Sequence, residues 1–252
     1  MLYKFKRVIK NPSIVRNVIL WNCYVCRVKL SNTFHESRRP STVSCSLNEL
    51  IEINNRRTLD TDMSDHLPHL FAISMLVKPE LIVELGVRDG DSTFVLERVA
   101  RLNSCPLISV DLDDCSAVTD WKDWHFVQQD DISFAREFSE YCSKLGLRNR
   151  EIDVLFLDTS HLYDHTVQEL EHWIPLLSKK GCLILHDTNH HRSVQRQDGR
   201  AMLCVENREV TSALEKYFCC QLDTVNDFIT VHSGWLISHR ACSYGFTVIQ
   251  RI

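Results

Sequence analysis

The sequence lacks any run of 18 consecutive apolar residues, so it offers no transmembrane helix. It also lacks an excess of one charge, because 29 Lys and Arg stand against 33 Asp and Glu and leave a net charge of -4. This balance excludes a general attraction to nucleic acid. A signal peptide is not expected, since Asn22 interrupts the first apolar stretch and no small-residue cleavage site follows. We therefore expect a cytoplasmic protein without a nucleic-acid partner.

Two short motifs that could bind zinc are incomplete. Cys23 and Cys26 have the spacing of half a zinc site, but no second pair follows at a suitable distance. His161 and His165 have the spacing found in zinc proteases, yet Leu162 stands where the catalytic Glu is required. The chain nevertheless holds 11 cysteines, and most are expected to be small core residues in a reducing compartment.

The first thirty residues differ in charge from the rest of the chain. They carry seven Lys or Arg and no Asp or Glu, and their apolar residues are spaced for amphipathic helices. Two interpretations remain open: peripheral contact of residues 1–30 with an anionic membrane, or docking on the chain's own domain or on a second subunit of a homo-oligomer. We predict a basic amphipathic extension and linker over residues 1–46 and one α/β domain over residues 47–252.

The segment LIVELGVRDGDST, residues 81–93, organises that domain. A buried strand runs into Glu84, a tight turn follows with Gly86 and Gly90, and Ser92 opens a helix. Glycine suits such a turn because it adopts positive φ at little cost and lets a ligand approach the backbone. The spacing Glu-x-Gly-x-x-x-Gly differs from the Gly-x-Gly-x-x-Gly of pyrophosphate binders. It favours a nucleoside ligand without a diphosphate, S-adenosylmethionine above all, although a plain strand, turn and helix would have the same pattern.

Acidic residues follow the next two predicted strands. Asp111 ends the strand over residues 107–110, where a carboxylate can accept hydrogen bonds from both ribose hydroxyls. The alternative is a turn aspartate, because two more aspartates follow at once. Asp130 and Asp131 come after a short third strand over residues 125–127, and a carboxylate there can meet the adenine amino group.

The segment 152–189 contains two further buried strands, and each ends in a carboxylate. Asp158 ends the first, with His161 three residues beyond, while Asp187 and Asn189 follow the second. Because parallel strands bring their carboxyl ends to one edge of a sheet, these side chains are expected to converge beside the glycine turn. Two carboxylates and an amide oxygen suit Mg²⁺ or another divalent cation, and a nearby imidazole can accept a proton from a hydroxyl. Alternatively, both aspartates only cap the helices that follow.

On these residues, the chain from about position 47 resembles the class I S-adenosylmethionine-dependent methyltransferases. The matching pieces are VELGVRDGDST, SVDLDD, VLFLDTSHLYDHTVQELEHWIPLLSKKGCLILHDTN and the last strand, YGFTVIQRI. Within that group the chain resembles the branch of cephalosporin hydroxylase-like proteins and sugar and macrolide O-methyltransferases. The resemblance implies an α/β fold, a Rossmann-like three-layer sandwich around a mostly parallel seven-stranded sheet whose last strand is antiparallel.

The resemblance also implies a role for each matching residue. The implied cofactor ligands are Glu84, Gly86, Gly90 and Ser92 near the methionine, Asp111 at the ribose, and Asp130 and Asp131 at the adenine. The implied catalytic residues are His161, as general base, and Asp158, and the implied metal ligands are Asp158, Asp187 and Asn189. The family often has a second acidic residue beside the position of Asp187, where this chain has His186 and Thr188.

We therefore expect an S-adenosylmethionine-dependent O-methyltransferase, assisted by Mg²⁺ or another divalent cation, that acts on a hydroxyl of a sugar, a glycan or a glycosylated metabolite. Two vicinal sugar hydroxyls can chelate one cation, which favours that substrate class. The polar segment 190–209 is expected to be a loop, either facing the substrate or solvated on the surface. Two other functions stay open, a non-catalytic binding or assembly module and a hydroxylase of the same branch.

Overall fold

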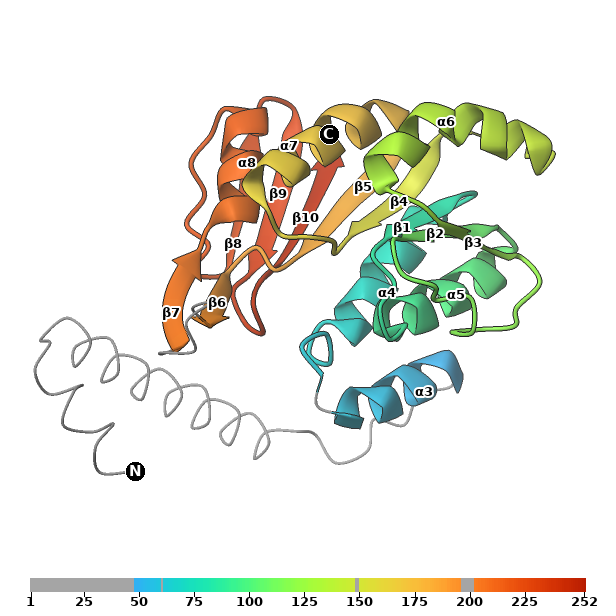
Figure 1. Ribbon diagram of the computed structural model, residues 1–252, viewed down its shortest axis with the longest axis horizontal. Coiled ribbons are helices and arrows are strands. Elements are labelled where there is room, and N and C mark those ends of the chain that lie inside the picture. Colours follow the sequence, from blue (N-terminus) through green and yellow to red (C-terminus); the bar gives the residue numbers. More distant parts are fainter. Residues whose placement is uncertain (1–47, 60, 148–149, 196–201) are drawn as a thin grey trace, which may run out of the picture. The chain divides into compact units, whose positions relative to one another are not determined.

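The computed structural model describes residues 48–59, 61–147, 150–195 and 202–252, drawn as coloured ribbon in Figure 1. The extension expected over residues 1–46 lies outside these ranges, so its membrane contact and its part in a homo-oligomer stay predictions. Contacts within the chain define two units, of which the larger comprises residues 47–190 and 208–252 and the smaller includes His191–Asn207. In the described ranges no helix has both the length and the apolar content needed to cross a bilayer.

Helices and strands alternate along most of the larger unit, as expected for an α/β domain. Its helices are α3 (Asn48–Arg56), α4 (Leu67–Val77), α5 (Asp91–Asn103), α6 (Asp131–Lys144), α7 (Tyr163–Trp173) and α8 (Glu209–Phe218), with short 3-10 turns at Arg57–Leu59 and Ile174–Leu176. Its strands are β1 (Ile82–Leu85), β2 (Leu107–Asp111), β3 (Trp124–Gln128), β4 (Ile152–Leu157), β5 (Leu177–His186), β8 (Phe228–His232), β9 (Trp235–Arg240) and β10 (Phe246–Arg251).

One eight-stranded sheet of order β3-β2-β1-β4-β5-β10-β9-β8 forms the centre of this unit. Strands β1 to β5 run parallel, and β10, β9 and β8 extend the sheet as antiparallel neighbours. The expected Rossmann-like, mostly parallel sheet is confirmed, but it has eight strands where seven were expected. The eighth arises because Ser233 and Gly234, with φ of 48° and 81°, form a tight turn that divides one expected strand into β8 and β9.

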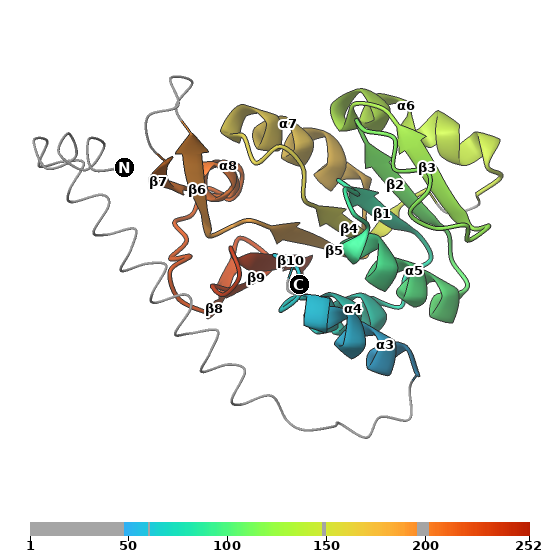
Figure 2. The ribbon, with the colours of Figure 1, turned by 60° about the horizontal axis from the view of Figure 1, so that its bottom comes forward.

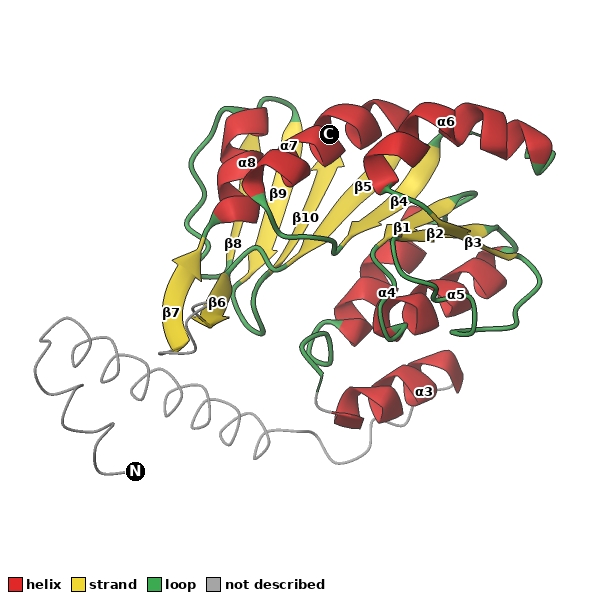
Figure 3. Ribbon diagram, viewed as in Figure 1, coloured by secondary structure: helices red, strands yellow, loops and turns green. Residues whose placement is uncertain are grey.

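Helices cover both faces of the sheet and give the expected three layers. In Figures 1 and 3, helices α6, α7 and α8 lie on one side, and α3, α4 and α5 lie on the other. Figure 2 shows α4 and α5 side by side against the sheet. Strand β1 feeds both cores, because Val83 and Leu85 pack in the cluster of α6 to α8, whereas Ile82 packs in the cluster of α3 to α5.

The register of the central strands brings distant residues to one edge. Leu157 at the end of β4 pairs with Leu85 of β1 on one side and with Leu185 of β5 on the other. The residues that follow these positions therefore leave the sheet next to one another, among them Gly86 and Asp158. This edge is the expected place for a ligand in a doubly wound α/β sheet.

The segment expected as a polar loop after β5 is more regular than the sequence indicates. It contains strands β6 (His190–Gln195) and β7 (Met202–Asn207), which pair as a separate two-stranded sheet. The prediction of a loop over residues 190–209 was therefore wrong for most of its length. Backbone pairing satisfies the hydrogen-bonding groups of a polar segment as well as solvent does, so polarity alone does not exclude strands.

Candidate functional site

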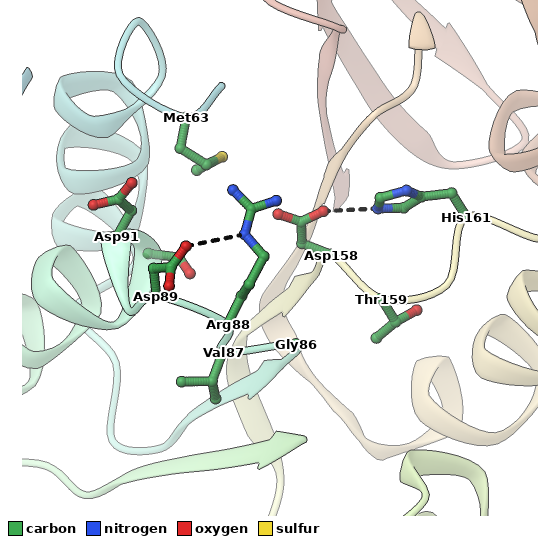
Figure 4. Close-up of a pocket in the computed structure, with 10 residues that line it drawn as sticks. Met63, Gly86, Val87, Arg88, Asp89, Asp91, Asp158, Thr159 and His161 are labelled. Carbon is green, nitrogen blue, oxygen red and sulfur yellow. Dashed lines mark hydrogen bonds and ion pairs between the residues drawn. The ribbon is translucent and has the colours of Figure 1, made fainter. Parts of the chain in front are cut away.

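A cleft opens at the carboxyl ends of β1 and β4 (Figure 4). Its empty volume, including the open mouth, is about 430 Å³. The residues that line it are Met63, Gly86, Val87, Arg88, Asp89, Asp91, Ser92, Asp158, Thr159 and His161. The glycine turn thus faces the residues that follow β4, as the sequence predicts.

The two glycines of the turn are required for different reasons. Gly86 has φ of +88°, and a Cβ atom there would lie 2.0 Å from the carbonyl oxygen of Asp158, so any side chain would push β1 and β4 apart. Gly90 has φ of +78° and is the N-cap of α5, where a Cβ atom would lie 2.3 Å from Cγ1 of Val118. Gly86 lines the cleft, whereas Gly90 packs against the loop that follows β2.

Glu84, expected near the methionine of the cofactor, is not among the residues that line the cleft. Its side chain is fully buried, and its carboxylate accepts hydrogen bonds from Thr93 Oγ1 at 2.9 Å and from Ser109 Oγ at 2.5 Å. Burial raises the pKa of Glu84 to about 7, against the opposing effect of these hydroxyls. The carboxylate therefore ties β1 to β2 and to α5 beneath the turn.

Asp111 holds the turn from the end of β2. Its Oδ2 accepts hydrogen bonds from the backbone N–H groups of Val87 at 2.7 Å and Arg88 at 3.1 Å, and its Oδ1 accepts one from Asp113 N–H. These contacts are those of a turn aspartate, and the ribose role stays a prediction.

The two acidic residues expected at the adenine lie at the start of α6. Asp130 is the N-cap of this helix and accepts a hydrogen bond from Ser133 N–H at 2.8 Å, which lowers its pKa. Asp131 faces α7, where its Oδ1 lies 3.0 Å from Nε2 of His165. Asp130 therefore holds the helix start, and Asp131 belongs to a second cluster described below.

Asp158, His161 and Asp187 meet at the rim of the cleft. Nε2 of His161 lies 2.9 Å from Oδ1 of Asp158 and 2.9 Å from Oδ2 of Asp187, and one ligand atom from each of the three residues lies within 4.8 Å of the others. His161 and Asp187 both have positive φ, 54° and 56°, a conformation that costs side-chain-bearing residues free energy and concentrates at functional sites. The convergence expected from strand order is present.

His186 lies beneath this cluster and is fully buried. Its Nε2 donates a hydrogen bond to the carbonyl oxygen of Ser243 at 3.2 Å, so its Nδ1 faces Asp158 at 3.4 Å and Asp187 at 3.5 Å. Burial alone would lower the pKa of His186, but the two carboxylates raise it well above 6.5. His186 therefore contributes a positive charge where the family often has a second carboxylate.

The two carboxylates also govern the protonation of His161. Burial would lower the pKa of His161, but its hydrogen bonds to Asp158 and Asp187 raise that pKa to about 9. Without a cation on the aspartates, His161 is thus mainly an imidazolium at neutral pH. The donor set of two converging carboxylates fits a divalent cation, which would take over the charge that now holds this proton.

Asn189, the third metal ligand expected, is engaged elsewhere. Its Nδ2 donates a hydrogen bond to the carbonyl oxygen of Ala241 at 3.0 Å, and its backbone N–H donates to Tyr244. Thr188, beside Asp187, points toward Thr247, whose hydroxyl donates to Thr188 Oγ1 at 2.8 Å. Among the His, Cys, Asp and Glu side chains of the described residues, the potential ligands at this edge are Asp158, His161 and Asp187, and ligation by the amide oxygen of Asn189 stays a prediction.

Sequence reasoning missed six residues of the cleft lining, which are Met63, Val87, Arg88, Asp89, Asp91 and Thr159. Arg88 lies inside the glycine turn, has φ of 47°, and forms a bidentate ion pair with Asp62 from the segment before α4. Figure 4 shows its guanidinium group pointing into the space between Asp89 and Asp158. The position of Arg88 between Gly86 and Gly90 is the sequence signal that could have identified it as a cleft residue. No such signal exists for Met63, because its approach to the cleft depends on tertiary packing.

Comparisons with known proteins find a family model that matches part of the chain and solved structures with a similar fold. Residues 83–188 match a family model described as a methyltransferase domain. A search of curated proteins finds no match. Among solved structures, methyltransferase PaMTH1 of Podospora anserina, bound to S-adenosylhomocysteine, is 12% identical with a TM-score of 0.51, covering 90% of this chain and 95% of that one.

Two further solved structures are similar to this chain. A Staphylococcus aureus protein assigned as a caffeoyl-CoA O-methyltransferase is 12% identical with a TM-score of 0.53, over 90% of this chain and all of that chain. MycE, a methyltransferase of the mycinamycin biosynthetic pathway solved with Mg, S-adenosylhomocysteine and mycinamycin VI, is 16% identical with a TM-score of 0.50. That match covers 81% of this chain and 53% of MycE.

The fold and the matched domain define a class for this part of the chain. Residues 83–188 match a methyltransferase domain, and the chain has the fold of the class I S-adenosylmethionine-dependent methyltransferases that its sequence resembles. More particularly, the matched region begins within β1, ends two residues after β5, and contains the glycine turn, Asp111, Asp158 and Asp187.

Proposed function

We propose that this enzyme transfers the methyl group of S-adenosylmethionine to a hydroxyl oxygen, with His161 as the general base and a divalent cation held by Asp158 and Asp187. The observation that carries the proposal is the meeting of these three side chains at the rim of the cleft that Gly86 forms. A base and two carboxylates beside a cofactor cleft suit a reaction in which an oxygen nucleophile must lose its proton.

The lining of the cleft fits the charges of the cofactor. S-adenosylmethionine supplies an electrophilic methyl group on a positively charged sulfur. Arg88 offers a cation for the carboxylate of the methionine moiety, and Asp158 offers negative charge beside the sulfonium and the amino group. Asp111, at the end of β2 beside the glycine turn, is the candidate for a ribose hydroxyl.

The chain's own residues would then carry out proton removal and alignment. Nε2 of His161 accepts the proton of the substrate hydroxyl, the oxygen forms a bond to the methyl carbon, and the carbon–sulfur bond breaks. The products are the methyl ether and S-adenosylhomocysteine. The cation, for which we propose Mg²⁺, would supply Lewis-acid polarisation of the hydroxyl. Alignment of oxygen and methyl carbon by the cleft would supply much of the remaining rate.

The proposed substrate class is a sugar, a glycan or a glycosylated metabolite. Two vicinal hydroxyls can chelate a single cation, and of the proposed ligands Asp158 lines the cleft, while Asp187 is buried next to it. A structural relative solved with both Mg and S-adenosylhomocysteine, MycE, supports a metal in this fold without fixing the substrate here.

The test is transfer of labelled methyl from S-adenosylmethionine to a panel of sugar nucleotides and glycans, with Mg²⁺ or with EDTA. We expect turnover that depends on Mg²⁺, and cofactor binding by calorimetry that EDTA leaves nearly unchanged. Full turnover in EDTA would remove the metal from the proposal and leave metal-free base catalysis. A non-catalytic module would show no heat of cofactor binding, and a hydroxylase would bind the cofactor without transferring methyl.

A further inference from the structure

A second cluster of ligand-type side chains lies between α6 and α7, away from the proposed cation at Asp158 and Asp187. Asp131 is the first residue of α6, and His165 and Glu169 lie one turn apart on α7. One ligand atom from each lies within 4.8 Å of the others. The mechanism proposed above uses none of the three.

Two carboxylate oxygens in this cluster are buried without a partner. The side chain of Glu169 is fully buried, and that of Asp131 is 9% exposed. As carboxylates, Glu169 Oε2 and Asp131 Oδ2 have no hydrogen-bond partner among the described residues. Burying such oxygens unpaired is costly, so their arrangement calls either for a proton shared between the two carboxyl groups, since burial and Asp131 raise the pKa of Glu169 to about 8, or for a cation.

The distances in the cluster match those of a small tetrahedral metal site. Nε2 of His165 lies 3.0 Å from Oδ1 of Asp131 and 3.6 Å from Oε1 of Glu169. Ligands about 2.0–2.1 Å from a tetrahedral zinc ion are about 3.3–3.4 Å apart, midway between these values. One imidazole and two carboxylates form a donor set that zinc accepts, and the 24% exposure of His165 leaves a path for the ion and for a water ligand.

We propose that Asp131, His165 and Glu169 bind one zinc-type divalent cation that ties the start of α6 to α7. Thr159 connects this site to the cleft, because its hydroxyl donates a 2.5 Å hydrogen bond to Oε1 of Glu169 and its side chain lines the cofactor cleft. The cation would thus fix the position of Thr159 and the helix start behind the adenosyl pocket. This inference stands whether or not the proposed acceptor and base are correct.

The test uses the full chain, stripped with a chelator and reloaded with Zn²⁺ or with Co²⁺ as a spectroscopic probe. His165→Gln removes a ligand, and His172→Gln is the matched control, because His172 lies on the same helix and its Nδ1 lies 2.8 Å from the carbonyl oxygen of Gln168. We expect the His165 variant to bind one equivalent of zinc less than the parent and the control. Sites elsewhere, at the cysteines or at Asp187, contribute equally to all three proteins.

Two further readouts separate a metal from a shared proton. At about 100 times its Kd, zinc should raise the melting temperature of the parent and of the control by about 5–10 °C, and of the His165 variant by much less. Glu169→Gln, which keeps the shape of the side chain, should weaken zinc binding at least tenfold if the His165 variant does not fold. Equal zinc content and equal melting shifts in the parent and the variants would overturn the site and show that a proton joins Asp131 to Glu169.

Discussion

Replacement of His161 by Gln tests the general-base role through its pH dependence. The pKa of His161 is about 9 because Asp158 and Asp187 each lie 2.9 Å from its Nε2. At pH 7 an imidazole with that pKa is neutral in about one molecule in a hundred. The residual kcat in chelator should therefore rise about tenfold per pH unit from pH 7 and level off near 9. Mg²⁺ on the two carboxylates should move this inflection to lower pH.

The glutamine variant has no titrating group at this position. We expect its kcat to fall by about 10²–10⁴-fold, equivalent to roughly 3–5 kcal/mol in the barrier, and the inflection to disappear. KM for the cofactor should change by less than about threefold, because the imidazole acts on the substrate proton. The assay is steady-state transfer of labelled methyl between pH 6 and 10, with His172→Gln as the control.

The result that would refute this reasoning is a His161→Gln enzyme with the parental kcat and pH profile. It would show that another group removes the proton and that the close approach of Asp158 and Asp187 to His161 is structural. A change confined to KM would make His161 a positioning residue for the substrate.

Three other perturbations follow from the structure. Gly86→Ala should lower the melting temperature by about 4–8 °C and abolish cofactor binding. The control is Gly234→Ala, which also has positive φ, 81°, but has nothing within 4 Å of the added Cβ among the described residues, so it should lower the melting temperature less. Equal effects of the two substitutions would contradict the clash with Asp158. Burial and the charge of His186 lower the pKa of His66 to about 3. Neutral His66 therefore stabilises the fold above pH 6.5. As the pH falls from 6.5 toward 3, the free energy of unfolding should decrease by up to about 1.4 kcal/mol per pH unit. In acid denaturation His66→Asn should flatten that slope, and an unchanged slope would assign it to other groups. Arg88→Gln should weaken cofactor binding about tenfold, as measured by calorimetry. Its melting temperature should change by less than about 2 °C, because the ion pair between Arg88 and Asp62 is exposed. Unchanged affinity would remove Arg88 from the cofactor site.

The strand ends were predictable from the sequence because burial and chain direction fix them. The run from Val154 to Leu157 is apolar throughout, as a strand covered on both faces requires, and parallel pairing then places Asp158 beside Gly86. The same logic located Asp187. What the pattern could not show is the direction of each side chain after its strand, such as the turn of Asn189 toward Ala241.

Residues whose roles depend on long-range packing escaped prediction. His186 was seen as a departure from the family pattern, but its orientation depends on the carbonyl of Ser243, 57 residues further along the chain, which leaves Nδ1 facing Asp158 and Asp187. Glu84 was expected at the ligand, yet the hydroxyls of Thr93 and Ser109 enclose it. The turn at Ser233 and Gly234 was missed because apolar and β-branched residues flank it on both sides.

The most direct measurement is a crystal structure of the protein with S-adenosylhomocysteine and Mn²⁺, in which anomalous scattering locates the metal. The account predicts the adenosyl group in the cleft beside Gly86 and manganese bound by both Asp158 and Asp187. A cleft without the nucleoside, or manganese absent from that pair of carboxylates while the nucleoside is bound, would contradict it.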